Sequence, residues 1–401
     1  MNPPSFRATV VALAAGQLVC WAALYYAFSS FVLPMQRAFG WSKPQMMGAL
    51  TLGLAVWGAA TYAAGAAIDA GRGRALMTLG AALAGIGFLL WSQVDSLPLL
   101  YAAWALLGAS MAMTLYEPAF NILTKRFPER YREGITSLTL VGGFASTLSF
   151  PAAAWLIARF EWRIALAIIG AVLLLLVAPL HAWALRGTPA RTARTHGHDP
   201  AKDLAKDATL HEALRDRSFW LLTVTFTLYS FAAAAMWAHM MPAFAAKGYG
   251  EAQALAVVVW FGPAQVAGRF AYLGFGRWVS ARHLGLWVLA GLPVSLAIFA
   301  LADRTAALLV FALLFGVANG LVTIVRGSLV PEYFGREHVG RISGAMTGIS
   351  LFARASAPLA TAWLLIALPG YREMLLVLAA VGAAAVAAFA LARRPHGVAP
   401  A

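Results

Sequence analysis

Three arginines lie inside long apolar stretches that contain no other charged side chain: Arg269, Arg326 and Arg354. A guanidinium stays charged at any physiological pH, and a charge near the centre of a bilayer costs about 2.5–3.5 kcal/mol. Such a residue persists only where it is paired or where it faces a water-filled cavity. Glu117 is the only acid at comparable depth. This excess of positive charge predicts that the chain binds an anion.

Long apolar stretches like those around the three arginines recur along the chain, and they determine the fold class. The chain is 61% hydrophobic and 11% charged, whereas soluble domains carry about 25% charged residues. Each stretch is long enough for a helix across roughly 30 Å of hydrocarbon, and open backbone groups find no partner in lipid. The sequence therefore predicts an all-α polytopic membrane protein of twelve transmembrane helices, over residues 8–36, 44–68, 75–94, 96–116, 134–158, 164–185, 218–246, 252–276, 283–302, 305–331, 342–371 and 374–392.

The segments that connect the predicted spans are alternately rich and poor in Lys and Arg. The rich segments include 70–74, 125–132 and 186–217. Short loops rich in Lys and Arg stay on the cytoplasmic side. We therefore expect a multi-pass protein of the cell inner (plasma) membrane with both termini in the cytoplasm. The net charge of +14 is spread over these loops, which argues against nucleic acid as a partner and leaves the lipid bilayer as the expected surroundings.

We expect no metal and no cofactor. A single cysteine, Cys20, allows neither an internal disulfide nor a thiolate cluster. His196 and His198 stand two residues apart in the 186–217 segment, a spacing that suits a metal ion. A solvated linker is the favoured interpretation, because no third ligand lies near them in sequence.

The chain repeats itself after about 208 residues. Matching positions are Pro34 and Pro242, Gly108 and Gly316, Pro151 and Pro358, and Trp155 and Trp363, with Gly134 and Gly142 matching Gly340 and Gly348 slightly out of step. Parallel repeats of this kind build transporters from two similar halves. The sequence thus predicts an N-terminal six-helix half over 1–185, a cytoplasmic central loop over 186–217 and a C-terminal six-helix half over 218–401.

Twelve helices in two parallel halves resemble the major facilitator superfamily. The segment "GAAIDAGRGR" resembles the family's loop signature G-x-x-x-D-R-x-G-R-[KR], through Gly65, Asp69, Gly71, Arg72 and Arg74. The resemblance implies that these residues form a conformational latch, in which the aspartate caps a helix and the basic residues contact acids. Ala70 replaces the usual arginine, which predicts a weaker latch.

A second resemblance concerns the substrate. "GPAQVAGRFAYLG", with Arg269, is similar to the helix-8 arginine segment of monocarboxylate porters. Arg354 is similar to the mid-span basic residue on helix 11 of the oxalate/formate antiporter group. In both groups these positions bind carboxylates. Proton-coupled porters carry an aspartate four residues before the helix-8 arginine, where this chain has Gln265, so proton coupling by that route is not expected.

Four further residues are candidates for the transport pathway. Glu117 and Arg326 occupy nearly equivalent places in the two repeats; they are either a gate or structural charge pair, or else Glu117 carries a proton. Tyr25 and Asn319 lie near the middle of helices 1 and 10, which line the cavity in this superfamily. Substrate-binding candidates are thus Arg269, Arg354, Gln265, Tyr25 and Asn319.

These observations predict a secondary transporter of a small organic anion, most simply a monocarboxylate, that works by alternating access as a monomer, with protons or a counter-anion as the coupled species. The first alternative is an exporter of drugs or other hydrophobic compounds, disfavoured because the intramembrane charges are basic. The second is a membrane-embedded enzyme or sensor. The sequence contains no Walker, zinc-protease or hydrolase motif, so we do not expect an enzyme.

Overall fold

The computed structural model describes residues 3–187, 207–302 and 304–394. His196, His198 and most of the predicted central loop lie outside these ranges. Within them, every regular element is a helix, and twelve spans have the length and hydropathy of membrane-crossing helices. The predicted all-α fold and its twelve spans are therefore confirmed for the part of the chain that the structure covers.

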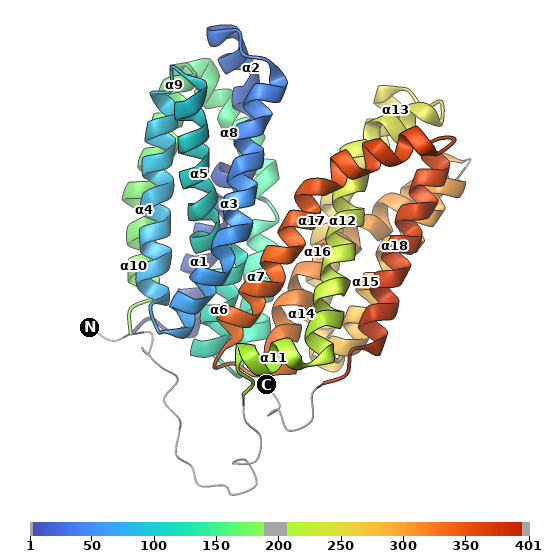
Figure 1. The fold of residues 1–401 in the computed structure, drawn as a ribbon. Coiled ribbons are helices and arrows are strands. Elements are labelled where there is room, and N and C mark those ends of the chain that lie inside the picture. Colours follow the sequence, from blue (N-terminus) through green and yellow to red (C-terminus); the bar gives the residue numbers. More distant parts are fainter. Residues whose placement is uncertain (1–2, 188–206, 303, 395–401) are drawn as a thin grey trace, which may run out of the picture. The chain divides into compact units, whose positions relative to one another are not determined.

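The helices form two compact units (Figure 1). Unit 1 comprises residues Met1–Asp203 and Arg336–Gly348. Its helices are α1 (Phe6–Cys20), η1 (Trp21–Tyr26), α2 (Phe28–Phe39), α3 (Lys43–Asp69), α4 (Gly73–Ser92), α5 (Leu97–Thr114), α6 (Tyr116–Arg126), α7 (Tyr131–Gly142), α8 (Ala145–Phe160), α9 (Trp162–Val172), η2 (Leu173–Val177) and α10 (Ala178–Ala184).

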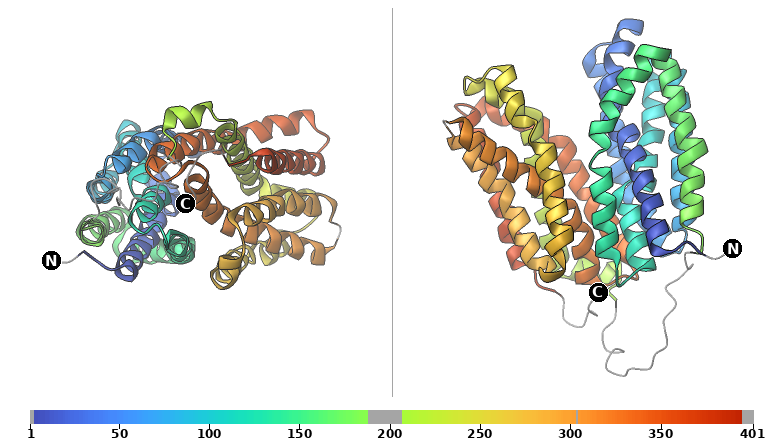
Figure 2. Two further views of the ribbon diagram at one scale, coloured as in Figure 1. Left: turned by 90° about the horizontal axis from the view of Figure 1, so that it is seen from below. Right: turned by 180° about the vertical axis from the view of Figure 1, so that it is seen from behind.

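Unit 2 comprises residues Leu204–Gly335 and Ile349–Ala401. Its helices, drawn from three directions in Figures 1 and 2, are α11 (Leu210–Arg215), α12 (Arg217–Ala246), α13 (Glu251–Val258), α14 (Phe261–Phe275), η3 (Gly276–Trp278), α15 (Ala281–Leu301), α16 (Thr305–Phe334), α17 (Val339–Ala367) and α18 (Tyr371–Leu391). The first turns of α17 belong to unit 1. Residues of this segment contact α3 and α6: Gly340 and Arg341 donate to Asp69, and Ser343 bonds to Asn121.

Small residues let the spans pack closely, and they do so in the same way in both repeats. Gly108 of α5 lies against Gly53 of α3, so that a side chain at Gly108 would collide with the Gly53 carbonyl. Gly316 of α16 lies against Phe261 of α14, where an added Cβ would come within 2.8 Å of the Phe261 carbonyl oxygen. The two partners, Gly53 and Phe261, are themselves 208 residues apart. The internal repeat read from the sequence is thus also a repeat of helix contacts.

One span of unit 1 is broken within its apolar length. α5 ends at Thr114, Leu115 has extended backbone, and α6 begins at Tyr116. The buried side chain of Gln17 donates from Nε2 to the carbonyl oxygens of Thr114 (2.6 Å) and Leu115 (3.3 Å). Backbone that leaves the helix at membrane depth needs such partners, because lipid offers none. Gln17 therefore stabilises the break that places Glu117 at the start of a new helix.

Candidate functional site

The most deeply buried arginine of the predicted site is Arg269. Its side chain projects from α14 and is 4% exposed. The Nε–H group donates to the carbonyl oxygen of Gly320 on α16 at 2.9 Å. Because one edge of the guanidinium is held by this bond, its position is fixed relative to two packed helices. A fixed positive charge inside an apolar span is the feature that an anion site requires.

Gly320 also brings two other predicted residues to the same place. An added Cβ at Gly320 would lie 2.8 Å from the backbone oxygen of Gln265, so α14 and α16 touch there. Asn319 precedes Gly320, is half-buried, and donates from Nδ2 to the Phe315 carbonyl at 2.9 Å. Arg269 and the backbone of Gln265 therefore both meet Gly320 at one contact between α14 and α16, and Asn319 is the neighbouring residue of α16.

The other two intramembrane arginines also belong to unit 2. Arg354 lies on α17 beyond Gly348 and is half-buried. Arg326 lies on α16, half-buried, with Cζ 6.0 Å from the ring centroid of Phe226 on α12. All three predicted intramembrane arginines are thus carried by one unit, and Glu117 by the other.

Glu117 and Tyr25 lie in unit 1, around the broken span. Glu117 is in the first turn of α6, where a carboxylate interacts favourably with the helix dipole. Tyr25 belongs to the π-helical turn η1 and packs against Trp21, with ring centroids 5.4 Å apart. Trp21 in turn lies 4.8 Å from Tyr116, the neighbour of Glu117. The two candidates therefore flank one aromatic cluster, and π-helical turns are frequent at functional sites.

The predicted latch centres on Asp69, whose side chain is 1% exposed. Its carboxylate accepts from the backbone N–H groups of Gly340 (3.0 Å) and Arg341 (2.8 Å), in the first turn of α17. Lys125 Nζ of α6 lies 2.8 Å from Asp69 Oδ1 and also donates to the Glu337 carbonyl. Asp69 thus binds both a helix N-terminus and a lysine.

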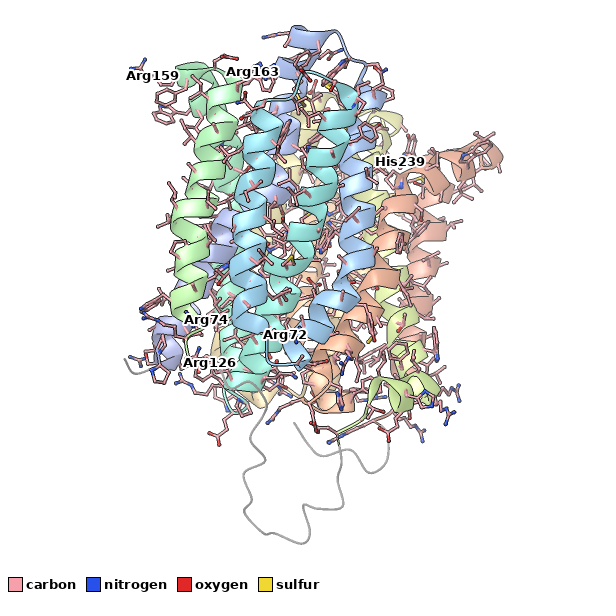
Figure 3. The ribbon with its side chains drawn as sticks, turned by 60° about the vertical axis from the view of Figure 1, so that its left-hand side comes forward. Arg72, Arg74, Arg126, Arg159, Arg163 and His239 are labelled. Atoms are coloured by element: carbon pink, nitrogen blue, oxygen red, sulfur yellow. The ribbon has the colours of Figure 1, made fainter. Side chains whose placement is uncertain are left out.

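Of the remaining latch residues, Gly65, Gly71 and Arg74 have clear local roles. Gly71 has φ +76°, a conformation that favours glycine, and Gly65 lies directly against Gly340. Arg72 is exposed, and Arg74 donates from Nε to the Ala182 carbonyl of α10 at 2.9 Å. The ion pair with Asp69 is therefore made by Lys125, which the motif does not include. Figure 3 shows Arg72, Arg74 and Arg126 at one end of unit 1 and Arg159 and Arg163 at the other.

Sequence reasoning missed three residues that position the site: Lys125, Gln17 and Gly320. Lys125 and Gln17 act through contacts distant in sequence, with Asp69 and Thr114, that no local pattern reveals. The break that Gln17 supports has one local signal, the proline at 118 inside an apolar stretch, since proline has no N–H to donate to the carbonyl four residues before it, that of Thr114.

Twelve apolar helices with charged residues inside the spans define a polytopic α-helical membrane protein, and comparison with known proteins gives its family. The Major Facilitator Superfamily profile matches residues 13–302. The chain therefore belongs to this superfamily of transporters.

The relatives that the chain matches include two mammalian transporters. The chain is 31% identical over 274 residues to monocarboxylate transporter 13 of Rattus norvegicus, covering 67% of this chain and 60% of the transporter. It is 29% identical over 266 residues to the Bos taurus protein of the same name, covering 65% and 59%. The match thus spans about three fifths of the length of these relatives.

Solved structures share the fold at low identity. The E. coli fucose:proton symporter FucP superposes with a TM-score of 0.74 at 15% identity, over 96% of this chain and 98% of the symporter. The human organic anion transporter MFSD10 (TETRAN) superposes with a TM-score of 0.72 at 16% identity, over 96% and 100%. These similarities support the major facilitator fold.

Proposed function

We propose that this protein is a secondary active transporter of a small organic anion, in the simplest case a monocarboxylate, and that it works by alternating access as symport or exchange. The observation that carries the proposal is the buried, helix-anchored guanidinium of Arg269. Arg354, Gln265 and Asn319 are proposed as further substrate ligands from unit 2, and Tyr25 from unit 1.

The chemistry favours a carboxylate. A guanidinium presents N–H groups in a planar fork that matches the two oxygens of a carboxylate. Anion binding would also offset the cost of holding a positive charge in a medium of low polarity. The name of the two relatives, monocarboxylate transporter 13, supports the same class of substrate.

The coupled species, the orientation and the state of assembly are part of this proposal. We infer that protons or a counter-anion drive transport, that Glu117 and Arg326 act in coupling or gating, and that Asp69 with its neighbours stabilises one conformational state. We further infer a monomer in the cell inner membrane, with both termini on the cytoplasmic side.

A thermal-shift screen of the purified protein tests the substrate class. A ligand that binds only the folded protein raises the melting temperature by mass action. We expect small monocarboxylates to raise the melting temperature and their methyl esters to leave it unchanged, because an ester has no negative charge. A shift with cationic or hydrophobic drugs, and none with any carboxylate, would replace this proposal with a drug exporter.

A further inference from the structure

The C-terminal turn of α10 in unit 1 is surrounded by three arginines, two from the helices α4 and α6 and one from the turn that follows α10. Arg74 at the start of α4 donates from Nε to the Ala182 carbonyl at 2.9 Å, and Arg126 at the end of α6 donates from Nη1 to the Ala184 carbonyl at 2.9 Å. Arg186 Nε lies 3.5 Å from the carbonyl oxygen between them, that of Trp183. These three residues are called the arginine cluster below.

A helix C-terminus explains only part of this charge. Its unpaired carbonyls are equivalent to about half of one negative charge, and one cation is enough to satisfy that. Arg74 is exposed, and its hydrogen bond to Ala182 uses Nε, at the inner edge of the guanidinium. Among the described residues, no carboxylate lies within ion-pair distance of Arg74. Its terminal nitrogens are thus placed to receive an anion from outside the protein.

The surface next to the arginine cluster, along α4 and the η2–α10 segment, is apolar and exposed. α4 packs against both η2 and α10. Their outward side chains include Leu79 (53% exposed), Leu175 (73%), Leu176 (59%) and Trp183 (40%). Leu79 is one to two helical turns further along α4 than Arg74, and the leucines of η2 are about two turns before Trp183. The charge therefore lies at one end of an apolar strip, beside an exposed tryptophan.

We propose that the arginine cluster and this strip bind one anionic phospholipid, with its phosphate on Arg74 and its acyl chains along Leu79, Leu175 and Leu176. A lipid is the occupant that presents a negative headgroup and a long apolar tail in this order. Trp183 is placed as tryptophans are at membrane interfaces, where the indole lies at headgroup level. Basic residues grouped between spans on the cytoplasmic side bind anionic headgroups by the same attraction.

The lipid site does not depend on what the protein transports. It is tested with the purified full-length protein in neutral detergent, to which phosphatidylglycerol or phosphatidylcholine is added. The melting temperature is measured, together with retention of each lipid by native mass spectrometry. We expect phosphatidylglycerol to raise the melting temperature more than phosphatidylcholine does. We expect Arg74→Gln to weaken the affinity for phosphatidylglycerol about fivefold. This is the change in affinity that the attraction of one basic residue to an anionic membrane surface gives.

Two matched variants separate a site from general surface charge. Arg74→Lys keeps the positive charge and should retain most of the phosphatidylglycerol effect. Arg159 is an exposed arginine at the opposite end of unit 1 (Figure 3), so Arg159→Gln should behave as the wild type. The proposal is overturned if Arg74→Gln retains the full response, if Arg159→Gln loses as much, or if inorganic phosphate alone reproduces the shift.

Discussion

Lys125 Nζ lies 2.8 Å from Asp69 Oδ1, and the same carboxylate accepts the backbone N–H of Arg341. Asp69 therefore joins α6 and the N-terminus of α17 to the end of α3. The motif's usual arginine is Ala70 in this chain, and the lysine supplies the positive charge from another helix. The aspartate of the motif is thus paired with a lysine that lies outside the motif.

The first prediction concerns Asp69 itself. Asp69→Asn keeps the size of the side chain but removes the charge that faces both Lys125 and the α17 N-terminus. Removing one partner of a buried charge pair typically costs about 3–5 kcal/mol, so the melting temperature should fall clearly. Asp95→Asn, at an exposed position beyond α4, is the matched control and should leave the melting temperature unchanged. Equal behaviour of the two variants would show that Asp69 is not an anchor.

A double-mutant cycle tests whether Lys125 is the partner. Lys125→Met as a single substitution should destabilise the protein, because Asp69 then loses its cation. In the Asp69→Asn background the same change should have a much smaller effect, with a coupling energy of about 0.5–3 kcal/mol. Chemical denaturation in detergent gives the four stabilities. If the two effects simply add, Lys125 and Asp69 do not act as a pair.

Gly320 should be intolerant of even one extra carbon. In Gly320→Ala the new methyl group would meet the Gln265 backbone at 2.8 Å, which forces α14 away from α16 and shifts Arg269. We expect a lower melting temperature and loss of substrate binding together. Gly262→Ala on α14 is the control, since nothing lies within 4 Å of the added Cβ. A fully active Gly320→Ala variant would mean that this contact does not position Arg269.

If Glu117 carries a proton, Glu117→Gln should abolish substrate accumulation driven by a pH gradient in proteoliposomes and preserve exchange of substrate for substrate. Glu117 also lies in the first turn of α6, so about 0.3–1 kcal/mol of stability should be lost with its charge. Glu251→Gln, which neutralises an exposed carboxylate in the first turn of α13, controls for that dipole effect. Gradient-driven accumulation that survives in Glu117→Gln would make Glu117 a structural or gating residue.

The orientation in the membrane can be tested by labelling single cysteines in intact cells. Cys20 is fully buried and should remain silent. An impermeant maleimide added outside should label Arg159→Cys and not Arg72→Cys, because the basic end of unit 1 is predicted to face the cytoplasm. Labelling in the reverse pattern would invert the proposed topology.

The sequence predicted the spans well because lipid imposes one simple rule, that apolar stretches of sufficient length become helices. It also located the repeat, since Gly108 and Gly316 make equivalent contacts. It could not predict that Arg336–Gly348 packs with unit 1, because Asp69 binds a helix that lies more than 250 residues away in the chain. The partners of Arg74 and Arg269 are backbone carbonyls, Ala182 and Gly320, and carbonyl acceptors leave no signature in a sequence.

The central claim is that Arg269 binds the carboxylate of the substrate, and equilibrium binding to matched variants tests it most directly. The measurement is the affinity of the purified protein for a monocarboxylate that shifts the wild-type melting temperature. Arg269→Ala should bind about ten- to a hundredfold more weakly, since a hydrogen bond to a charged group contributes about 1.5–3 kcal/mol. Arg269→Lys should recover part of the loss, because it keeps the charge without the planar fork. Arg304→Ala, which removes an exposed arginine of unit 2, should bind as the wild type does. A folded Arg269→Ala protein with wild-type affinity would contradict the account.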